Sequence, residues 1–174
     1  MNHFKLIILT MSFLIIISCE KDDICPDSTQ TTPQLVVAFY DALDPQQSKI
    51  VESLAVYAIK DSELILIENI NGINTDSIAI PLRNDIGVSN FRFIRNYSVE
   101  NNIIFGDLNH VYIDYEMTDV FISRACGFIT NYSILSLAPY DILQDPPVVG
   151  WIGGYEIVNP IVTNENQAHV KILH

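Results

Sequence analysis

The chain of 174 residues lacks the sequence patterns that mark common enzyme sites. It contains no His-Glu-x-x-His pair for zinc, no Gly-x-Ser-x-Gly turn for a hydrolase and no glycine-rich phosphate loop. Beyond the N-terminal segment, the histidines are His110, His169 and His174, and their spacing does not suit a tetrahedral zinc site. We therefore expect a protein that is not an enzyme and that holds neither a metal nor a cofactor.

Positive charge is also scarce. The chain has 9 Lys and Arg against 21 Asp and Glu, which gives a formal net charge of −12. Such a chain repels phosphate groups, so we exclude nucleic acid as a partner and expect no binding to anionic lipid headgroups by charge. Asp114 and Glu116 share one face of an expected strand. The spacing of oxygen ligands that a calcium loop needs is absent, so we expect water to cover this face and no ion to bind there.

Long hydrophobic runs are limited to the N-terminus. His3 and Lys5 precede a mostly apolar run, Leu6 to Ile17, which has the length of a signal-peptide core and is too short to cross a bilayer as a helix. Ile16-Ile17-Ser18-Cys19 resembles the lipobox of bacterial lipoprotein precursors, in which the cysteine thiol receives lipid and the chain is cut before it. The alternative is a buried helix that happens to end in a cysteine.

These features predict three parts: a signal peptide over 1–18, a lipidated tether over 19–32 and a β-domain over 33–174. The lipid on Cys19 would make the membrane a partner and place the exported protein at the outer membrane, on the periplasmic or cell-surface side. The charged residues 20–23 resemble the surface-export tag of Bacteroidota lipoproteins. They equally suit a solvated tether.

Cysteine is rare, with three residues in the chain. Once Cys19 is assigned to lipid, Cys25 and Cys126 remain, and an exported protein most simply pairs them. The closed loop of about 100 residues would stabilise the fold by roughly 4–5 kcal/mol in the chain-entropy model. Two free buried thiols are the alternative.

Helical periodicity is almost absent, and short apolar or alternating runs predict an all-β protein. We expect about nine strands in an immunoglobulin-like two-sheet antiparallel β-sandwich. The expected strands include 34–40, 64–67, 78–82, 111–118, 120–130, 132–137 and 155–162.

Three segments need separate interpretation. Residues 49–59 favour a strand through their β-branched and aromatic content, although Asp44-Pro45 could cap a helix there. Asn71-Gly72 is expected in a connection between strands, because this pair favours positive φ. Residues 107–109 are expected to form a turn.

Trp151, together with Tyr140 and Tyr155, brackets a proline-containing loop. Exposed aromatic side chains of this kind stack on sugars or anchor partners, so these three residues are candidate ligand or partner contacts. The alternative is that they close the end of the hydrophobic core.

The segments around Cys19–Cys25, Ser123–Gly127 and Ala168–Ile172 resemble a small flavobacterial-type lipoprotein family of Bacteroidota, known only as a domain of unknown function. The resemblance implies an outer-envelope lipoprotein and, as a partner, a small β-barrel of the outer membrane. It supplies no active-site residues.

The sequence therefore predicts a non-enzymatic protein-interaction or structural module anchored through Cys19. A glycan- or small-ligand-binding module that uses Trp151 is the alternative function.

Overall fold

The computed structural model describes residues 24–139 and 150–174, so Cys19 and Tyr140 lie outside the described residues. The described residues form ten β-strands. Their bounds are β1 Leu35–Tyr40, β2 Val51–Lys60, β3 Glu63–Thr75, β4 Ser77–Ile80, β5 Val88–Glu100, β6 Ile103–Ser123, β7 Gly127–Ala138, β8 Gly154–Ile157, β9 Ile161–Val162 and β10 Val170–Leu173. Within 24–139 and 150–174, no helix is long and apolar enough to span a membrane.

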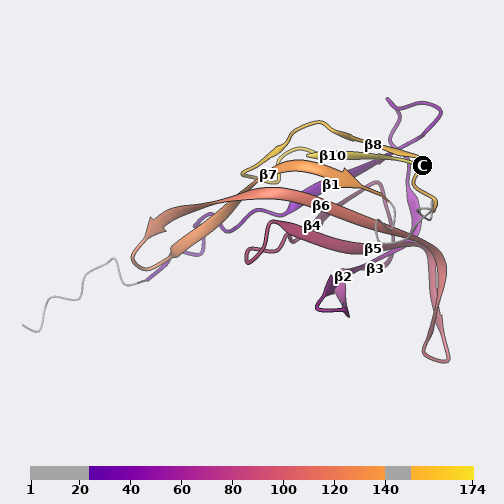
Figure 1. The fold of residues 1–174 in the computed structure, drawn as a ribbon, viewed down its shortest axis with the longest axis horizontal. Helices are drawn as coiled ribbons and strands as arrows, with labels where there is room; N and C mark the ends of the chain where they lie inside the picture. The colour runs from indigo at the N-terminus through magenta and orange to yellow at the C-terminus, as the bar shows by residue number, and fades with distance from the viewer. Residues whose placement is uncertain (1–23, 140–149) are drawn as a thin grey trace, which may run out of the picture. The chain divides into compact units, whose positions relative to one another are not determined.

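The described chain divides into two compact units. One combines residues 24–31 with 120–129, which include the turn between β6 and β7. The other contains residues 32–119, 130–139 and 150–174, and it carries both sheets except for the end of β6 and the start of β7 (Figure 1).

The strands form two sheets. The four-stranded sheet has the order β4-β1-β10-β8, in which β1 and β10 run parallel and the other neighbours antiparallel. The six-stranded sheet has the order β3-β2-β5-β6-β7-β9 and forms a curled antiparallel half-barrel. The all-β prediction is confirmed.

The immunoglobulin-like sandwich that strand spacing predicts is not what the structure shows. Spacing gives the number of strands but not their order or the curvature of the sheets. Here β5 and β6 are 13 and 21 residues long, and register shifts interrupt the β2–β3 and β5–β6 ladders. Such bulges bend strands and increase their twist, so the six-stranded sheet curls.

One hydrophobic core lies between the two sheets. The first strand contributes Leu35, Val37 and Phe39, which alternate with half-buried neighbours along β1. Phe91 and Phe93 of β5 are fully buried in the same core. The predicted alternation of β6 is confirmed at 111, 113 and 115, whereas Met117 is exposed.

The segment 49–59 is a strand, β2, as its composition favours. Asn71-Gly72 lies inside β3 and not in a connection between strands. The positive φ that this pair favours is present at Gly72, where φ is 68°, but it occurs within a strand whose pairing with β2 is irregular. Residues 120–130 are not one strand, since residues 124–126 form the turn between β6 and β7. Residues 155–162 contain two strands, β8 and β9.

The turn predicted at 107–109 is also wrong, because these residues lie within β6. Asn109 is buried, and its two amide atoms have protein partners. Its Nδ2 donates to the carbonyl of Pro139 at 2.6 Å, and its Oδ1 accepts from the Ile152 amide at 2.9 Å. The buried side chain of Asn109 thus provides hydrogen-bond partners for two backbone groups that lie outside β6.

His169 joins β1 to the segment before β10. The amide of Val36 donates to its Nδ1 at 3.0 Å, and its own amide donates to the Val36 carbonyl at 2.9 Å. The residue is completely buried. Burial lowers the pKa of His169 because the charged imidazolium would be desolvated.

Acidification should therefore destabilise the fold through His169. The unfolded imidazole binds a proton below about pH 6.5, whereas the folded one resists it, so stability is present above that pH and is lost as the pH falls. We expect urea unfolding to give a lower free energy at pH 5.5 than at pH 7.5. His169→Phe should cost about 1–3 kcal/mol at pH 7.5 by leaving the Val36 amide unpaired.

The same variant should also weaken the pH dependence. Part of the pH dependence of stability should remain in the variant, because burial lowers the pKa of His174 as well. Equal pH slopes for His169→Phe and the native protein would refute this role of His169.

Candidate functional site

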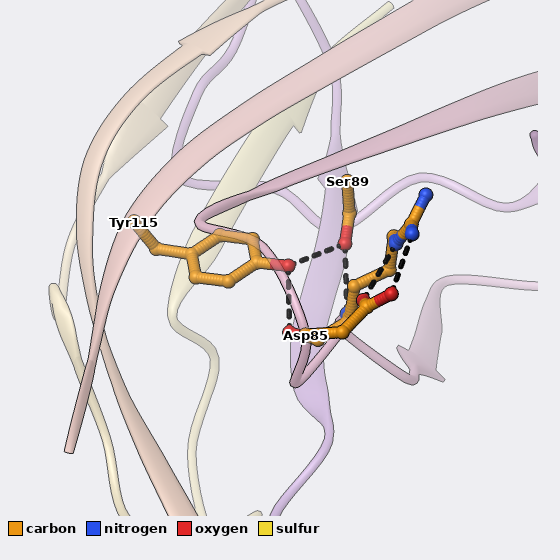
Figure 2. Close-up of polar contacts among 4 residues, drawn as sticks. Asp85, Ser89 and Tyr115 are labelled. Carbon is orange, nitrogen blue, oxygen red and sulfur yellow. Dashed lines mark hydrogen bonds and ion pairs between the residues drawn. The ribbon is translucent and has the colours of Figure 1, made fainter. Parts of the chain in front are cut away.

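The polar cluster richest in reactive groups lies beside the loop between β4 and β5. Figure 2 shows the phenol of Tyr115 pointing toward Ser89, with Asp85 beside them. Arg83, the fourth member, contacts Asp85 through two hydrogen bonds of 2.8 and 2.6 Å. A serine, a tyrosine, an arginine and a carboxylate together have the composition of a catalytic site.

Its hydrogen bonds form a closed ring. The Arg83 amide donates to Ser89 Oγ at 2.9 Å, and the Tyr115 hydroxyl donates to the Arg83 carbonyl at 2.9 Å. Because the Tyr115 proton is used there, Ser89 donates across the 2.7 Å contact to Tyr115 Oη. Both hydroxyl protons are thus committed within the cluster, and Ser89 is buried. The cluster holds the loop between β4 and β5 in place.

In the ion pair of the cluster, Asp85 is exposed and Arg83 is half-buried. The Arg83 guanidinium holds the pKa of Asp85 down at about 2, and burial raises the pKa of Tyr115. Asp85 therefore stays ionised, and Tyr115 stays protonated, at neutral pH.

Metal-ligand groups are not gathered anywhere in residues 24–139 or 150–174, where no three His, Cys, Asp or Glu side chains lie close enough to hold an ion. His169 hydrogen-bonds to β1, and the His174 ring lies edge-on to Trp151, with the centroids 5.5 Å apart.

Trp151 closes one end of the core. It is only 9% exposed, its Nε1 donates to the Phe93 carbonyl at 3.4 Å, and the Arg95 guanidinium lies 5.3 Å from its ring centroid. Tyr155, in β8, is 42% exposed. The structure therefore gives Trp151 the core position that was one of its two interpretations, while Tyr155 remains accessible on a different element.

Exposed apolar side chains instead gather on the outer face of the six-stranded sheet. On this face Ala55, Tyr57 and Ile94 form a small cluster separate from the main core, because they alternate with core residues such as Val56 and Phe93. Beside them lies a hollow of about 250 Å³. We call its lining the outer patch: Tyr57, Leu64, Arg92, Ile94, Ile104, Phe105, Gly106 and Leu108.

Tyr57 contacts an aromatic residue, Tyr97, at the edge of the outer patch. Its hydroxyl lies 2.8 Å from that of Tyr97, and burial followed by this hydrogen bond raises the pKa of Tyr57 to about 12. The Tyr57 phenol therefore remains neutral at physiological pH and gives the patch an uncharged floor.

The hairpin of β5 and β6 extends the apolar surface. Ile104 and Phe105 are 42% and 47% exposed, and Val99 and Ile103 near the turn are exposed as well. Asn101 and Asn102 make the turn with positive φ, as two-residue hairpin loops require. In Figure 1 this hairpin projects beyond the rest of the sheet.

A bulge bends this hairpin at Gly106. The register shifts between Arg95 and Ser98, and Gly106 has a φ of 138°, which suits glycine alone. Asp107 Oδ2 accepts from Arg95 Nε and from Asn96 Nδ2, both at 3.0 Å, and fixes the bulge.

Gly106→Ala should damage the hairpin. A Cβ there would lie 2.6 Å from the Arg95 carbonyl oxygen, at a φ that L side chains rarely adopt. We expect a loss of about 1–3 kcal/mol in urea unfolding, the usual cost of such strain. Gly153→Ala is the matched control, because its Cβ would find only ordinary contacts from 3.6 Å and should change stability little. Equal stabilities of the two variants would contradict the bulge as described.

The predicted disulfide is present in the smaller unit. Cys25 and Cys126 are bonded, with their Cα atoms 4.9 Å apart. The Thr29 hydroxyl lies 3.6 Å from the Cys126 sulfur, which has no proton in the disulfide and can only accept a hydrogen bond from it. This bond connects the segment that follows the expected lipidation site to the turn between β6 and β7.

Sequence reasoning missed the outer patch. Its residues come from β2, β3, β5 and β6, and one of them, Leu108, lies in the segment 107–109 that was expected to be a turn. The available signal was the run Ile103-Ile104-Phe105 directly after Asn101-Asn102, an apolar run following a hairpin turn.

Residues 53–174 match a family of unknown function (DUF6452). No curated protein and no solved structure matches the chain. The match covers more than half of the chain, so the chain belongs to this family.

Proposed function

We propose that this member of a family of unknown function is an outer-envelope lipoprotein that acts as a non-enzymatic protein-interaction module. In this proposal Cys19 carries the lipid, and the outer patch binds another envelope protein. The resemblance to flavobacterial-type lipoproteins supports a small outer-membrane β-barrel as that partner.

The observation that carries the interaction role is the apolar surface of the β5–β6 hairpin and the adjoining hollow. Outer faces of antiparallel sheets are normally polar where water covers them. Here Leu64, Ile104, Phe105 and Leu108 are all more than a third exposed around one hollow. Contiguous apolar surface of this kind marks an interaction site in soluble proteins.

The partner that suits the patch is a protein with a complementary apolar surface. Among the residues that the structure describes, Arg92 is the only charged one that lines the hollow, in a chain whose net charge is −12. A partner that places a carboxylate or a backbone carbonyl over Arg92, and apolar side chains over Ile104 and Phe105, would satisfy both kinds of group.

The alternative function, glycan or small-ligand binding through Trp151, has less support. An aromatic ring that stacks on a sugar must have one face exposed to solvent. The Trp151 ring is instead in contact with Arg95, His174 and Phe39. We therefore place the interaction at the outer patch.

Photocrosslinking in intact cells tests the interaction. A photoreactive phenylalanine analogue in place of Phe105 or Leu108 should crosslink to the same envelope protein from either position. Leu135 of β7 is the control position, because it is 59% exposed but does not line the hollow, and it should give no such product.

A second variant shows whether the side chains themselves bind. Ile104→Ser with Phe105→Ser should reduce co-purification of the crosslinked protein at least about tenfold, as truncation of interface anchors does. Leu135→Ser should leave it unchanged. Crosslinking from Leu135 alone, or unaltered co-purification by the double variant, would refute the outer patch as the binding surface.

Cys19→Ala tests the anchor. If Cys19 is the lipid-bearing residue, the variant should keep its signal segment and lose its acyl mass in mass spectrometry of the intact protein. Cys25→Ala is the matched control, since it removes a cysteine of the disulfide and should leave the lipid in place. Lipid that persists in Cys19→Ala would overturn the proposal.

A further inference from the structure

The smaller unit presents two phenylalanines to solvent. Phe121 at the end of β6 and Phe128 at the start of β7 are 56% and 67% exposed, and their rings pack edge to face with centroids 5.2 Å apart. Ile24, in the same unit, is 80% exposed. Each of these residues leaves more than half of its surface exposed to solvent, so much of its apolar surface stays unburied in the protein.

The disulfide places this surface close to the expected anchor along the chain. Cys25 is bonded to Cys126 in the turn that separates Phe121 from Phe128. Cys25 follows Cys19 by six positions. A fully extended chain of that length spans at most about 20 Å, so a lipid on Cys19 would lie within this reach of the disulfide.

The charge of the described part of the unit also suits a bilayer. Its described residues carry one acidic side chain, Asp27, and one basic side chain, Arg124, although the whole chain has a net charge of −12. Arg124 is exposed and lies between the two phenylalanines in sequence. An arginine in this position extends its guanidinium toward phosphate groups while its methylenes stay with apolar neighbours.

We propose that the tip of the β6–β7 hairpin is a membrane-contact surface, in which Phe121, Phe128 and Ile24 enter the interfacial region of the bilayer that holds the lipid of Cys19. This inference rests on the proposed lipidation and adds a second, protein-mediated contact with the same bilayer. Its consequence is that the hairpin tip stays at the membrane surface and does not swing freely on the tether.

Fluorescence quenching by brominated lipids tests the contact. The lipidated full chain carrying Phe128→Trp is reconstituted into phosphatidylethanolamine–phosphatidylglycerol vesicles with plain or brominated acyl chains. An indole buried about 5–10 Å into the headgroup–acyl boundary meets the bromines, so its emission should fall about twofold or more. Phe121→Trp is the second reporter and should behave in the same way.

Two references keep the result specific. The native protein reports Trp151, which is buried in the core and whose emission is subtracted from that of every variant. Leu135→Trp reports an exposed position in the larger unit. Both references should be quenched little.

The outcomes separate the membrane contact from the anchor. If the indoles introduced by Phe128→Trp and Phe121→Trp are quenched no more than the one introduced by Leu135→Trp, while mass spectrometry finds lipid on Cys19, the membrane contact is refuted and the proposed anchor stands. If Cys19 carries no lipid, the anchor and the membrane contact both fail.

Discussion

A side-chain hydrogen bond joins two irregular strands of the six-stranded sheet at the bulges that curl it. The hydroxyl of Ser53 in β2 donates to the carbonyl of Tyr97 in β5 at 2.8 Å. Ser53 has a positive φ of 46°, and Tyr97 lies in the register shift between Arg95 and Ser98. The amide of Ser53 in turn donates to Asn74 of β3. Three strands are therefore joined where their ladders are interrupted, and bulges at one place on neighbouring strands bend the sheet as a unit.

This curvature gives the two faces of the sheet different environments. The inner face encloses Phe91 and Phe93 with β1 and β10 in the main core. The outer face is covered only in part by its own small cluster around Tyr57 and Ile94. Because the bulge at Gly106 redirects the end of the hairpin, Ile104 and Phe105 lie beside this cluster and remain exposed. The bulges that curl the sheet around the main core are thus also the reason that residues of the outer patch stay exposed.

The sequence predicts what depends on local pattern and misses what depends on bulges. Alternation is visible at Val111, Ile113 and Tyr115 because a half-buried strand exposes every second residue, and β2 was recognised from its β-branched content. The pairing of Cys25 with Cys126 followed from the small number of cysteines in a chain expected to be exported.

Residues that act through long-range contacts could not be assigned in this way. Asn109 looks like a turn residue, yet in β6 it satisfies the backbone of Pro139 and Ile152. Trp151 looks like a binding residue, yet Phe93 and Arg95 contact it at the end of the core. The order of the strands, with β1 parallel to β10, has no signature in spacing, because it is determined by segments 133 residues apart, such as Val36 and His169.

The two exposed apolar surfaces differ in the partner that their charge allows. In the described part of the smaller unit, Asp27 balances Arg124, while residues 20–23 before it add three acidic side chains and one basic side chain to the sequence. A neutral apolar tip with one arginine approaches an anionic bilayer without repulsion. The outer patch belongs to the larger unit, where acidic residues outnumber basic ones, and the charged residue that lines its hollow is Arg92. The two proposals therefore assign different partners to the two surfaces: lipid to the hairpin tip, which carries Arg124, and protein to the outer patch, whose apolar residues surround Arg92.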